Sequence, residues 1–365
     1  MKFVTLFTAM SGLALATASP YGRGLLVDLD GGDSFSVSRG GRMEQGTIMD
    51  RLRKEDRFRQ FVKVLEKETG LRDDLDRRDT KVTLFAPTNE AMDRFEEEIR
   101  MAEREGDRPT MKEILSYHIV RDEEMKCKDM RPGMTLKTEL RPNHLDRHHQ
   151  RIRVVGFGGT PILNMRAGVQ DCDMRAENGM IHGISNVLIP PRDLYHQIYR
   201  IPTELSTWHM ALERTDMRKE LERGSAWTVF APSNEAWQRL GHQNLVHLFS
   251  CEKGMKQLKK IVEYHMAEDF AYADRIIKED RLRMKTRHNQ ELEVETCRRS
   301  GGCREGRRHD LDEHRRENPN KYMFVINRGE ARVEFQDIPS ENGVMHLINE
   351  VLIPEDVELP SERRM

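Results

Sequence analysis

Cysteine and histidine are side chains that zinc prefers, and one segment of this sequence contains four of them. They are Cys297, Cys303, His309 and His314. Their spacing does not fit a zinc finger, whose first pair is tighter and whose central gap is about 12 residues. Residues 144–149 contain a second histidine cluster, without a nearby glutamate base. We therefore predict no metal site and no cofactor.

The motifs of common catalytic sites do not occur in the sequence. There is no Gly-x-Ser-x-Gly elbow, no His-Glu-x-x-His pair and no phosphate-binding loop. The histidines and carboxylates that recur along the chain lie inside segments that we expect to define the fold. We therefore predict that the protein is not an enzyme, with an unrecognised hydrolase as an alternative.

The N-terminal residues predict entry into the secretory route. Residues 3–16 form a short apolar stretch behind Lys2, and small residues follow at 16–18, which is typical of a signal peptide over residues 1–18. We expect a flexible segment over 19–42 and a polar tail over 358–365. No later stretch is apolar enough to cross a membrane, so we predict no transmembrane segment.

The secretory route makes disulfides possible. The cysteines are Cys127, Cys172, Cys251, Cys297 and Cys303. Five is an odd number, so at least one of them is free or pairs between chains. Cys297 and Cys303 flank a Ser-Gly-Gly turn and could close a small loop, but the connectivity stays open.

Length and charge limit the class of protein. The 365 residues suggest about two domains, and 37% hydrophobic residues suffice for two modest cores. The 60 Lys and Arg residues nearly balance the 62 Asp and Glu residues. This balance excludes a globally basic nucleic-acid binder, and we predict no nucleic-acid partner.

Three sequence blocks occur twice in the same order. The pairs are 83–92 with 228–237, 114–118 with 261–265, and 178–190 with 342–354. Two copies of one domain are therefore predicted, over residues 43–192 and 193–357. The larger offset of the last pair places an insertion in the second copy, at about 297–320.

Each copy reads as helices followed by strands. Residues 82–86 are short, apolar and β-branched, as in a buried strand, and Thr88 and Ser233 are typical helix N-caps. A helical pattern over 111–120 ends at the Tyr-His pair, and the last strand is expected over 179–189. This order predicts an α+β fold.

The three blocks resemble fasciclin-type domains, which carry a Thr-x-Phe-Ala-Pro block, a central Tyr-His and a closing Asn-Gly-x-Ile-His block. The resemblance implies two tandem fasciclin-like domains, each a twisted β-wedge flanked by helices. The sequence departs from the family pattern at Ser185 and Asn349, where aspartate is frequent, and at Met92 and Trp237, where phenylalanine is usual.

In adhesive members of this family, the Tyr-His region and an Asp-Ile pair are implicated in integrin contact. The matching positions are Tyr117, His118, Asp173, Met174, Tyr264, His265, Asp337 and Ile338. The resemblance thus implies partner-binding residues for cell-surface or matrix proteins, including integrin-like receptors. The alternative is structural, with an aromatic ring in the core and a histidine bonded to the backbone.

The insertion contains a basic run. Its arginines include Arg298, Arg299, Arg304, Arg307 and Arg308. Such a run predicts binding to sulfated glycans or anionic lipid headgroups, and the alternative is a solvated, disordered loop. Together these features predict a secreted, non-enzymatic adhesion or extracellular-matrix protein. The alternative location is the lumen of a vacuole or lysosome-like compartment, with a role in membrane or cargo handling.

Overall fold

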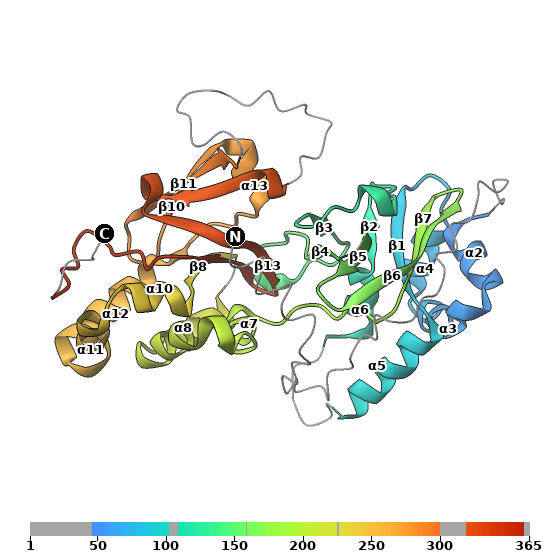
Figure 1. Cartoon of the computed structure of the whole chain (residues 1–365). Coiled ribbons are helices and arrows are strands. Elements are labelled where there is room, and N and C mark those ends of the chain that lie inside the picture. The colour runs from blue at the N-terminus through green and yellow to red at the C-terminus, as the bar shows by residue number, and fades with distance from the viewer. Residues whose placement is uncertain (1–45, 102–108, 158, 225, 300–318, 361–365) are drawn as a thin grey trace. The chain divides into compact units, whose positions relative to one another are not determined.

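A computed structural model describes residues 46–101, 109–157, 159–224, 226–299 and 319–360 (Figure 1). The predicted signal peptide over residues 1–18, the segment 19–42, most of the predicted insertion and the end of the polar tail lie outside the described residues. Contacts divide the chain into two compact units. Unit 1 comprises Met1–Pro132, Leu136–Leu140 and Val154–Pro190, and unit 2 comprises Gly133–Thr135, Arg141–Arg153 and Pro191–Met365.

The first half of the described chain forms short helices and a seven-stranded sheet. The helices are α2 (Ile48–Lys54), η2 (Asp56–Phe58), α3 (Arg59–Leu65), α4 (Thr69–Asp76), α5 (Asn89–Met101), α6 (Met111–Tyr117), η3 (Cys127–Asp129) and η4 (Asn143–Leu145). The strands are β1 (Val82–Pro87), β2 (Ile119–Arg121), β3 (Thr135–Lys137), β4 (Arg151–Phe157), β5 (Thr160–Leu163), β6 (Ala167–Ala176) and β7 (Gly179–Ile184).

The second half repeats this plan. Its helices are α7 (Leu194–Tyr199), α8 (Pro202–Arg214), α9 (Arg218–Arg223), α10 (Asn234–Arg239), α11 (His242–Ser250), α12 (Glu252–Tyr264), α13 (Ala273–Glu279), η5 (Pro319–Lys321) and η6 (Asn327–Gly329). Its strands are β8 (Trp227–Pro232), β9 (Met266–Ala267), β10 (Arg281–Lys285), β11 (Glu291–Arg298), β12 (Tyr322–Ile326), β13 (Ala331–Ser340) and β14 (Gly343–Ile348).

The two sheets have one topology. The strand orders are β2-β1-β7-β6-β5-β4-β3 and, in reverse direction, β10-β11-β12-β13-β14-β8-β9. In each, the strand of the first block pairs in parallel with the strand of the closing block, Val82 with Gly179 and Trp227 with Gly343. The α+β class and the duplication are therefore confirmed.

Every residue of these four strands is buried, which explains their continuous apolar character. In unit 1, α2, α3 and α4 pack Ile48, Phe61 and Leu75 into the same core as Leu84 of β1. A second core in unit 2 contains Phe230 of β8 and Ile348 of β14. Burial of these aliphatic and aromatic side chains provides the main driving force for each unit.

Two expected boundaries differ from the structure. The helix expected over 111–120 ends at Tyr117, because β-branched Ile119 and Val120 continue as β2 beside β1. The strand expected over 179–189 ends at Ile184. There the Ser185 hydroxyl accepts a hydrogen bond from the Gly168 backbone N–H at 2.9 Å, and the chain leaves the ladder at this serine.

Candidate functional site

The Tyr-His pairs lie at the C-terminal ends of α6 and α12, where both histidines are fully buried. Nδ1 of His118 lies 2.7 Å from the Ile114 carbonyl oxygen, and Nε2 lies 2.9 Å from the Leu188 backbone nitrogen. Nε2 therefore accepts a hydrogen bond from Leu188, and Nδ1 carries the proton. His265 makes the same two contacts, with Ile261 at 2.7 Å and Leu352 at 3.0 Å.

The tyrosines of these pairs are also interior residues. The hydroxyl of Tyr117 accepts a hydrogen bond from Asn164 Nδ2 at 2.8 Å, and the hydroxyl of Tyr264 accepts one from Asn327 at 3.0 Å. Burial raises the pKa of Tyr117, so this phenol remains neutral. Each Tyr-His pair therefore links the end of a helix to later segments of the same unit.

The histidines of the closing blocks lie on β7 and β14 and are fully buried. His182 Nε2 lies 2.8 Å from the Met125 carbonyl oxygen, and Nδ1 accepts a hydrogen bond from the Asp173 backbone N–H at 3.2 Å. His346 repeats this with Ala271 at 2.9 Å and Asp337 at 3.2 Å. All four block histidines thus use both ring nitrogens on the main chain.

Burial disfavours the charged form of His118, His182 and His346. Desolvation lowers the pKa of His118 and of His346 to about 4, and it lowers the pKa of His182 as well. Burial acts in the opposite direction on a carboxyl group and raises the pKa of Asp337 to about 7. The Ala273 N–H, 2.8 Å from Asp337 Oδ1, partly opposes that rise.

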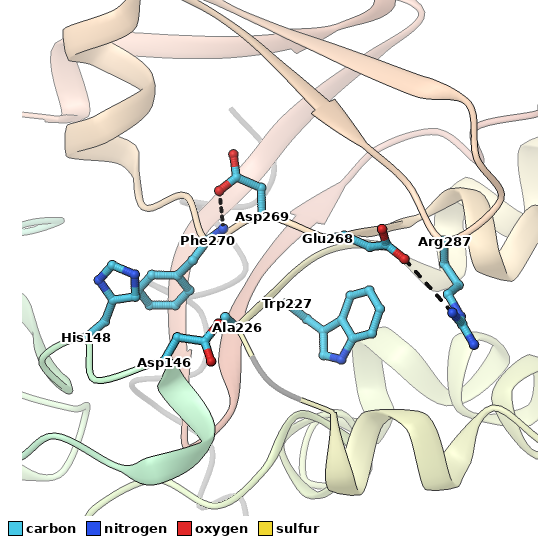
Figure 2. Close-up of a pocket in the computed structure, with 8 residues that line it drawn as sticks. All are labelled: Asp146, His148, Ala226, Trp227, Glu268, Asp269, Phe270 and Arg287. Atoms are coloured by element: carbon cyan, nitrogen blue, oxygen red, sulfur yellow. Dashed lines mark hydrogen bonds and ion pairs between the residues drawn. The ribbon is translucent and has the colours of Figure 1, made fainter.

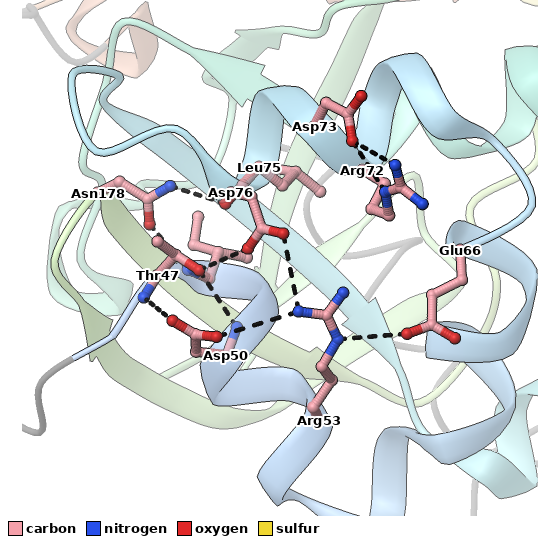
Figure 3. Close-up of polar contacts among 10 residues, drawn as sticks. Thr47, Asp50, Arg53, Glu66, Arg72, Asp73, Leu75, Asp76 and Asn178 are labelled. Atoms are coloured by element: carbon pink, nitrogen blue, oxygen red, sulfur yellow. Dashed lines mark hydrogen bonds and ion pairs between the residues drawn. The ribbon is translucent and has the colours of Figure 1, made fainter.

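Each closing block also begins with an Asn-Gly pair, Asn178-Gly179 in unit 1 and Asn342-Gly343 in unit 2, and these residues make structural contacts. Asn178 Nδ2 donates to the carbonyl of Leu75 at 2.8 Å (Figure 3). It also donates to the carbonyl of Arg77 at 2.7 Å, and Asn178 Oδ1 accepts from the Ile48 backbone N–H at 2.8 Å. Gly179 follows with a φ of +155°, and a Cβ there would lie 1.9 Å from the Val82 carbonyl oxygen. Glycine is therefore required where β7 meets β1.

Asn342 makes equivalent contacts in unit 2. Its Oδ1 accepts from the Leu194 backbone N–H at 2.9 Å, and its Nδ2 donates to the carbonyls of Leu221 and Gly224 at 2.7 and 3.0 Å. In both units this amide joins the start of the helical layer to the tip of the last hairpin. The asparagine is thus a structural residue, as the duplicated sequence block suggests.

Two aspartates occupy register shifts of β6 and β13, and both have a left-handed backbone with φ of +61°. Asp173 Oδ1 accepts from the Cys127 N–H at 2.9 Å, as Asp337 does from Ala273. The difference is access, because Asp173 is half-buried while Asp337 is 1% exposed. These two positions are the same site in two environments.

The sequence-predicted contact residues therefore fall into two groups. Those with buried side chains are Tyr117, His118, Met174, Tyr264, His265, Asp337 and Ile338. A partner cannot reach these side chains in the folded units, and their contacts hold the fold together. Asp173 alone in the set is partly accessible.

The basic run is only partly described. Arg298 is exposed at the end of β11, and Arg299 Nε donates to the Tyr322 carbonyl oxygen at 3.1 Å. Arg304, Arg307 and Arg308 lie outside the described residues. The polyanion-binding prediction thus remains a prediction.

The structure supplies a cysteine arrangement that the sequence left open. Cys127 and Cys172 form a disulfide, Cys251 carries a free, exposed thiol, and Cys297 is disulfide-bonded. Cys303, the expected partner of Cys297, lies outside the described residues. Among the described residues, one group of at least three possible metal ligands is present: Cys127, Cys172 and His182. Separation along the chain concealed this group, since the two cysteines are 45 positions apart in the sequence.

Unit 2 also contains a shallow hollow, shown in Figure 2. It is lined by Asp146, His148, Ala226, Trp227, Glu268, Asp269, Phe270 and Arg287. The His148 ring stacks on Phe270 with centroids 5.0 Å apart, and Glu268 faces Arg287 at 4.0 Å. Polar and aromatic side chains both line it, and we assign it no chemistry. Across the described residues, no helix combines the length and apolar character needed to cross a bilayer.

Both halves of the chain match one known protein family. The fasciclin domain family model matches residues 56–190 and 203–354. Transforming growth factor-beta-induced protein ig-h3 of the rabbit, Oryctolagus cuniculus, is 25% identical over 282 residues, covering 77% of this chain and 36% of that protein. Human periostin (Homo sapiens) is 25% identical over 276 residues, covering 76% and 29%.

The chain spans about a third of the length of these curated relatives. Among solved structures, a FAS1 domain pair from the insect cell adhesion molecule fasciclin I aligns with a TM-score of 0.39 and 20% identity. That alignment covers 82% of this chain and 97% of the other.

Proposed function

The chain belongs to the fasciclin domain family, and from this membership we propose that it is a secreted, non-enzymatic adhesion protein. It would act by binding cell-surface or extracellular-matrix partners through its two fasciclin domains. Two weak sites in one chain gain avidity when both engage the same surface. The proposal rests on family membership and on the finding that the recurring histidines form hydrogen bonds within the fold.

The supporting observation is the bonding of the four block histidines. His118, His265, His182 and His346 each have both ring nitrogens bonded to main-chain groups of their own unit. A general acid or base must instead reach the proton of a substrate. The recurring histidines therefore serve the scaffold, and we propose that exposed surfaces carry the binding function.

Asp173 is the residue of the predicted contact set that we propose as a partner contact. It lies on the bulged part of β6, next to Cys172 and near Asp171, whose carboxylate is 2.6 Å from Arg57 Nη1. A partly exposed carboxylate is a suitable ligand for receptors that bind acidic groups through a divalent cation. Asp337 is the matched residue of unit 2 and is enclosed.

Cell attachment tests this proposal with a matched pair of variants. Asp173→Asn and Asp337→Asn each retain a side-chain oxygen for the N–H of Cys127 or Ala273, and asparagine tolerates the left-handed backbone. We expect cells to attach to surfaces coated with the full chain, with a loss of at least about half for Asp173→Asn and little change for Asp337→Asn. Attachment should also require divalent cations.

Normal folding of both variants, checked by circular dichroism, is needed for this comparison. If cells fail to attach to the wild-type chain, and matrix proteins fail to bind it, the adhesion proposal is wrong. If attachment is normal in Asp173→Asn, adhesion stands but Asp173 is not its contact residue.

We further propose that the basic run binds sulfated glycans or anionic lipid headgroups. Arg298 is exposed at the edge of this run, as polyanion binding requires. Replacing Arg298, Arg304, Arg307 and Arg308 by serine should shift elution from a heparin column to lower salt, since the interaction is electrostatic. Unchanged elution would remove the run from the binding surface.

A vacuolar or lysosome-like location remains the alternative to secretion. Neutral buried histidines make an acidic lumen unfavourable, because His118 and His346 resist protonation in the folded chain. Tagging and fractionation distinguish the two locations, and recovery only from an acidic organelle would contradict secretion.

A further inference from the structure

The Cys127–Cys172 disulfide lies against the imidazole of His182 in unit 1. Cys127 is the first residue of η3, Cys172 lies within the second register shift of β6, and His182 lies on the adjacent strand β7. Cys127 Sγ is 3.5 Å from His182 Nδ1, and the ligand atoms of all three residues lie within 4.8 Å of one another. Sulfur and imidazole nitrogen are the ligand types that Zn²⁺ prefers.

The orientation of His182 suits a metal ligand. Its Nε2 lies 2.8 Å from the Met125 carbonyl oxygen, so the proton resides on Nε2 and Nδ1 presents a lone pair. Ligating histidines commonly donate their other N–H to a backbone carbonyl in this way. Nδ1 currently accepts a long hydrogen bond of 3.2 Å from the Asp173 N–H, which a metal ion would replace.

The equivalent position of unit 2, around His346, has the same backbone contacts but no cysteine. Ala273 stands in the place of Cys127, since its N–H donates to Asp337 as that of Cys127 does to Asp173. Gln336 precedes Asp337 as Cys172 precedes Asp173. The histidine contacts are nevertheless the same in both units, so this corner of the fold does not require the disulfide.

We propose that reduction of the Cys127–Cys172 disulfide opens a Zn²⁺ site formed by Cys127, Cys172 and His182. Zn–S and Zn–N distances of about 2.3 and 2.05 Å place sulfur and nitrogen about 3.6 Å apart in a tetrahedral site. The observed separation of Cys127 Sγ and His182 Nδ1 is 3.5 Å. Both cysteines are partly accessible, which gives the ion a path and leaves the fourth position to water.

A dithiol can reduce the Cys127–Cys172 disulfide by thiol–disulfide exchange. The protein S–S bond breaks, the two sulfurs of the reductant join as a disulfide, and Cys127 and Cys172 become thiols. Zn²⁺ then displaces one proton from each thiol and forms two Zn–S bonds and one Zn–N bond. Exchange with an oxidised dithiol re-forms the protein S–S bond, returns the exchanging reagent to its dithiol form and releases the ion, so the oxidised chain should not bind Zn²⁺ here.

Zinc titration of the full chain tests the proposal. The parent carries Cys251→Ser, because Cys251 is a free exposed thiol that could bind metal by itself. The matched control adds Cys127→Ala and Cys172→Gln, the residues that unit 2 carries at these positions. Both proteins retain Cys297 and Cys303, so any zinc bound there cancels in the comparison.

After reduction with a phosphine and its removal, the parent should bind one more equivalent of Zn²⁺ than the control. Before reduction the two should bind the same amount. Zn²⁺ should also protect Cys127 and Cys172 from alkylation, as mapped by peptide mass spectrometry. Adding His182→Gln to the parent should weaken the extra site at least about tenfold.

Three results would overturn the proposal. These are equal zinc content in the reduced parent and control, equal alkylation of Cys127 and Cys172 with and without zinc, and an extra equivalent already present in the oxidised parent. Alkylation is measured on the parent itself, so it decides the question even if the His182 variant does not fold. None of these measurements depends on the adhesion proposal.

Discussion

The Nε2 atom of His118 accepts a hydrogen bond from the backbone N–H of Leu188 at 2.9 Å, across 70 residues of chain. The other ring nitrogen donates to Ile114, one turn earlier on α6. One imidazole therefore ties the end of a helix to the segment that follows the last strand. His265 and Leu352 repeat this relationship in unit 2.

Truncating His118 should destabilise unit 1 strongly. His118→Ala leaves the Leu188 N–H and the Ile114 carbonyl unpaired and creates a cavity, at a cost of about 3 kcal/mol in the free energy of unfolding. His118→Gln retains some hydrogen bonding and should cost less. Urea denaturation measures both against Lys112→Ala, an exposed change on α6. Equal stabilities of the alanine and wild-type chains would contradict the structural role.

Acid should destabilise unit 1 more than unit 2. The pKa of His118 is about 4 in the folded chain and about 6.5 when unfolded, so only the unfolded chain gains this proton between those values. Stability from this histidine is complete above pH 6.5 and falls as pH decreases towards 4. His346 has the same effect on unit 2. Asp337 has the opposite effect, because its pKa is about 7 in the folded chain: the protonated carboxyl contributes stability that is lost as pH rises from about 4 to 7.

Hydrogen exchange of β1 and β8 at pH 7 and pH 5 measures this difference. Protection in β1 should fall more on acidification, because Asp337 offsets the loss in unit 2. Asp337→Asn removes the offset and should make β8 as acid-sensitive as β1. If the variant leaves the acid response of β8 unchanged, the opposing contributions are assigned wrongly.

Replacing Asn178 should destabilise unit 1, because this residue bonds the helical layer to the last hairpin. Asn178→Ala removes three hydrogen bonds to buried main-chain groups and should cost about 2–3 kcal/mol. Asn178→Asp should cost at least as much, since its carboxylate would face the carbonyls of Leu75 and Arg77. Thermal unfolding compares these with Arg175→Ala, an exposed neighbour on β6. A destabilisation no larger than that of the control would contradict the assignment.

Asp356 should contribute a small, salt-sensitive stability to unit 2. Lys260 and His288 hold its pKa at about 2, through contacts of 2.6 and 2.7 Å. The contribution is present above pH 4 and is lost as pH falls towards 2. Because the site is exposed, Asp356→Asn should cost less than about 1 kcal/mol at pH 7, and nothing in about 1 M salt. Stability measurements at both salt concentrations, with Glu358→Gln as an exposed control, check this. An effect unchanged by salt would contradict it.

Family membership and architecture could be predicted because the sequence contains the same three blocks twice, in the same order. Blocks such as 83–92 and 228–237 combine a buried strand with a helix N-cap, and each is a local pattern. The N-caps formed as expected, with the hydroxyls of Thr88 and Ser233 accepting from Ala91 and Ala236. The solvent exposure of individual side chains was harder to predict from the sequence. A Tyr-His pair has the same composition whether it faces a partner or the core.

Local sequence thus determined the repeated order of helices and strands, since hydrophobic periodicity, caps and Asn-Gly turns act over a few residues. Tertiary structure decided which residues meet across long stretches of chain. Only the fold brings Cys127, Cys172 and His182 together, encloses Asp337 while leaving Asp173 partly accessible, and directs His118 to Leu188. These relationships depend on pairing between strands that are far apart in the sequence, such as β1 with β7, and a local pattern does not specify which distant strands pair.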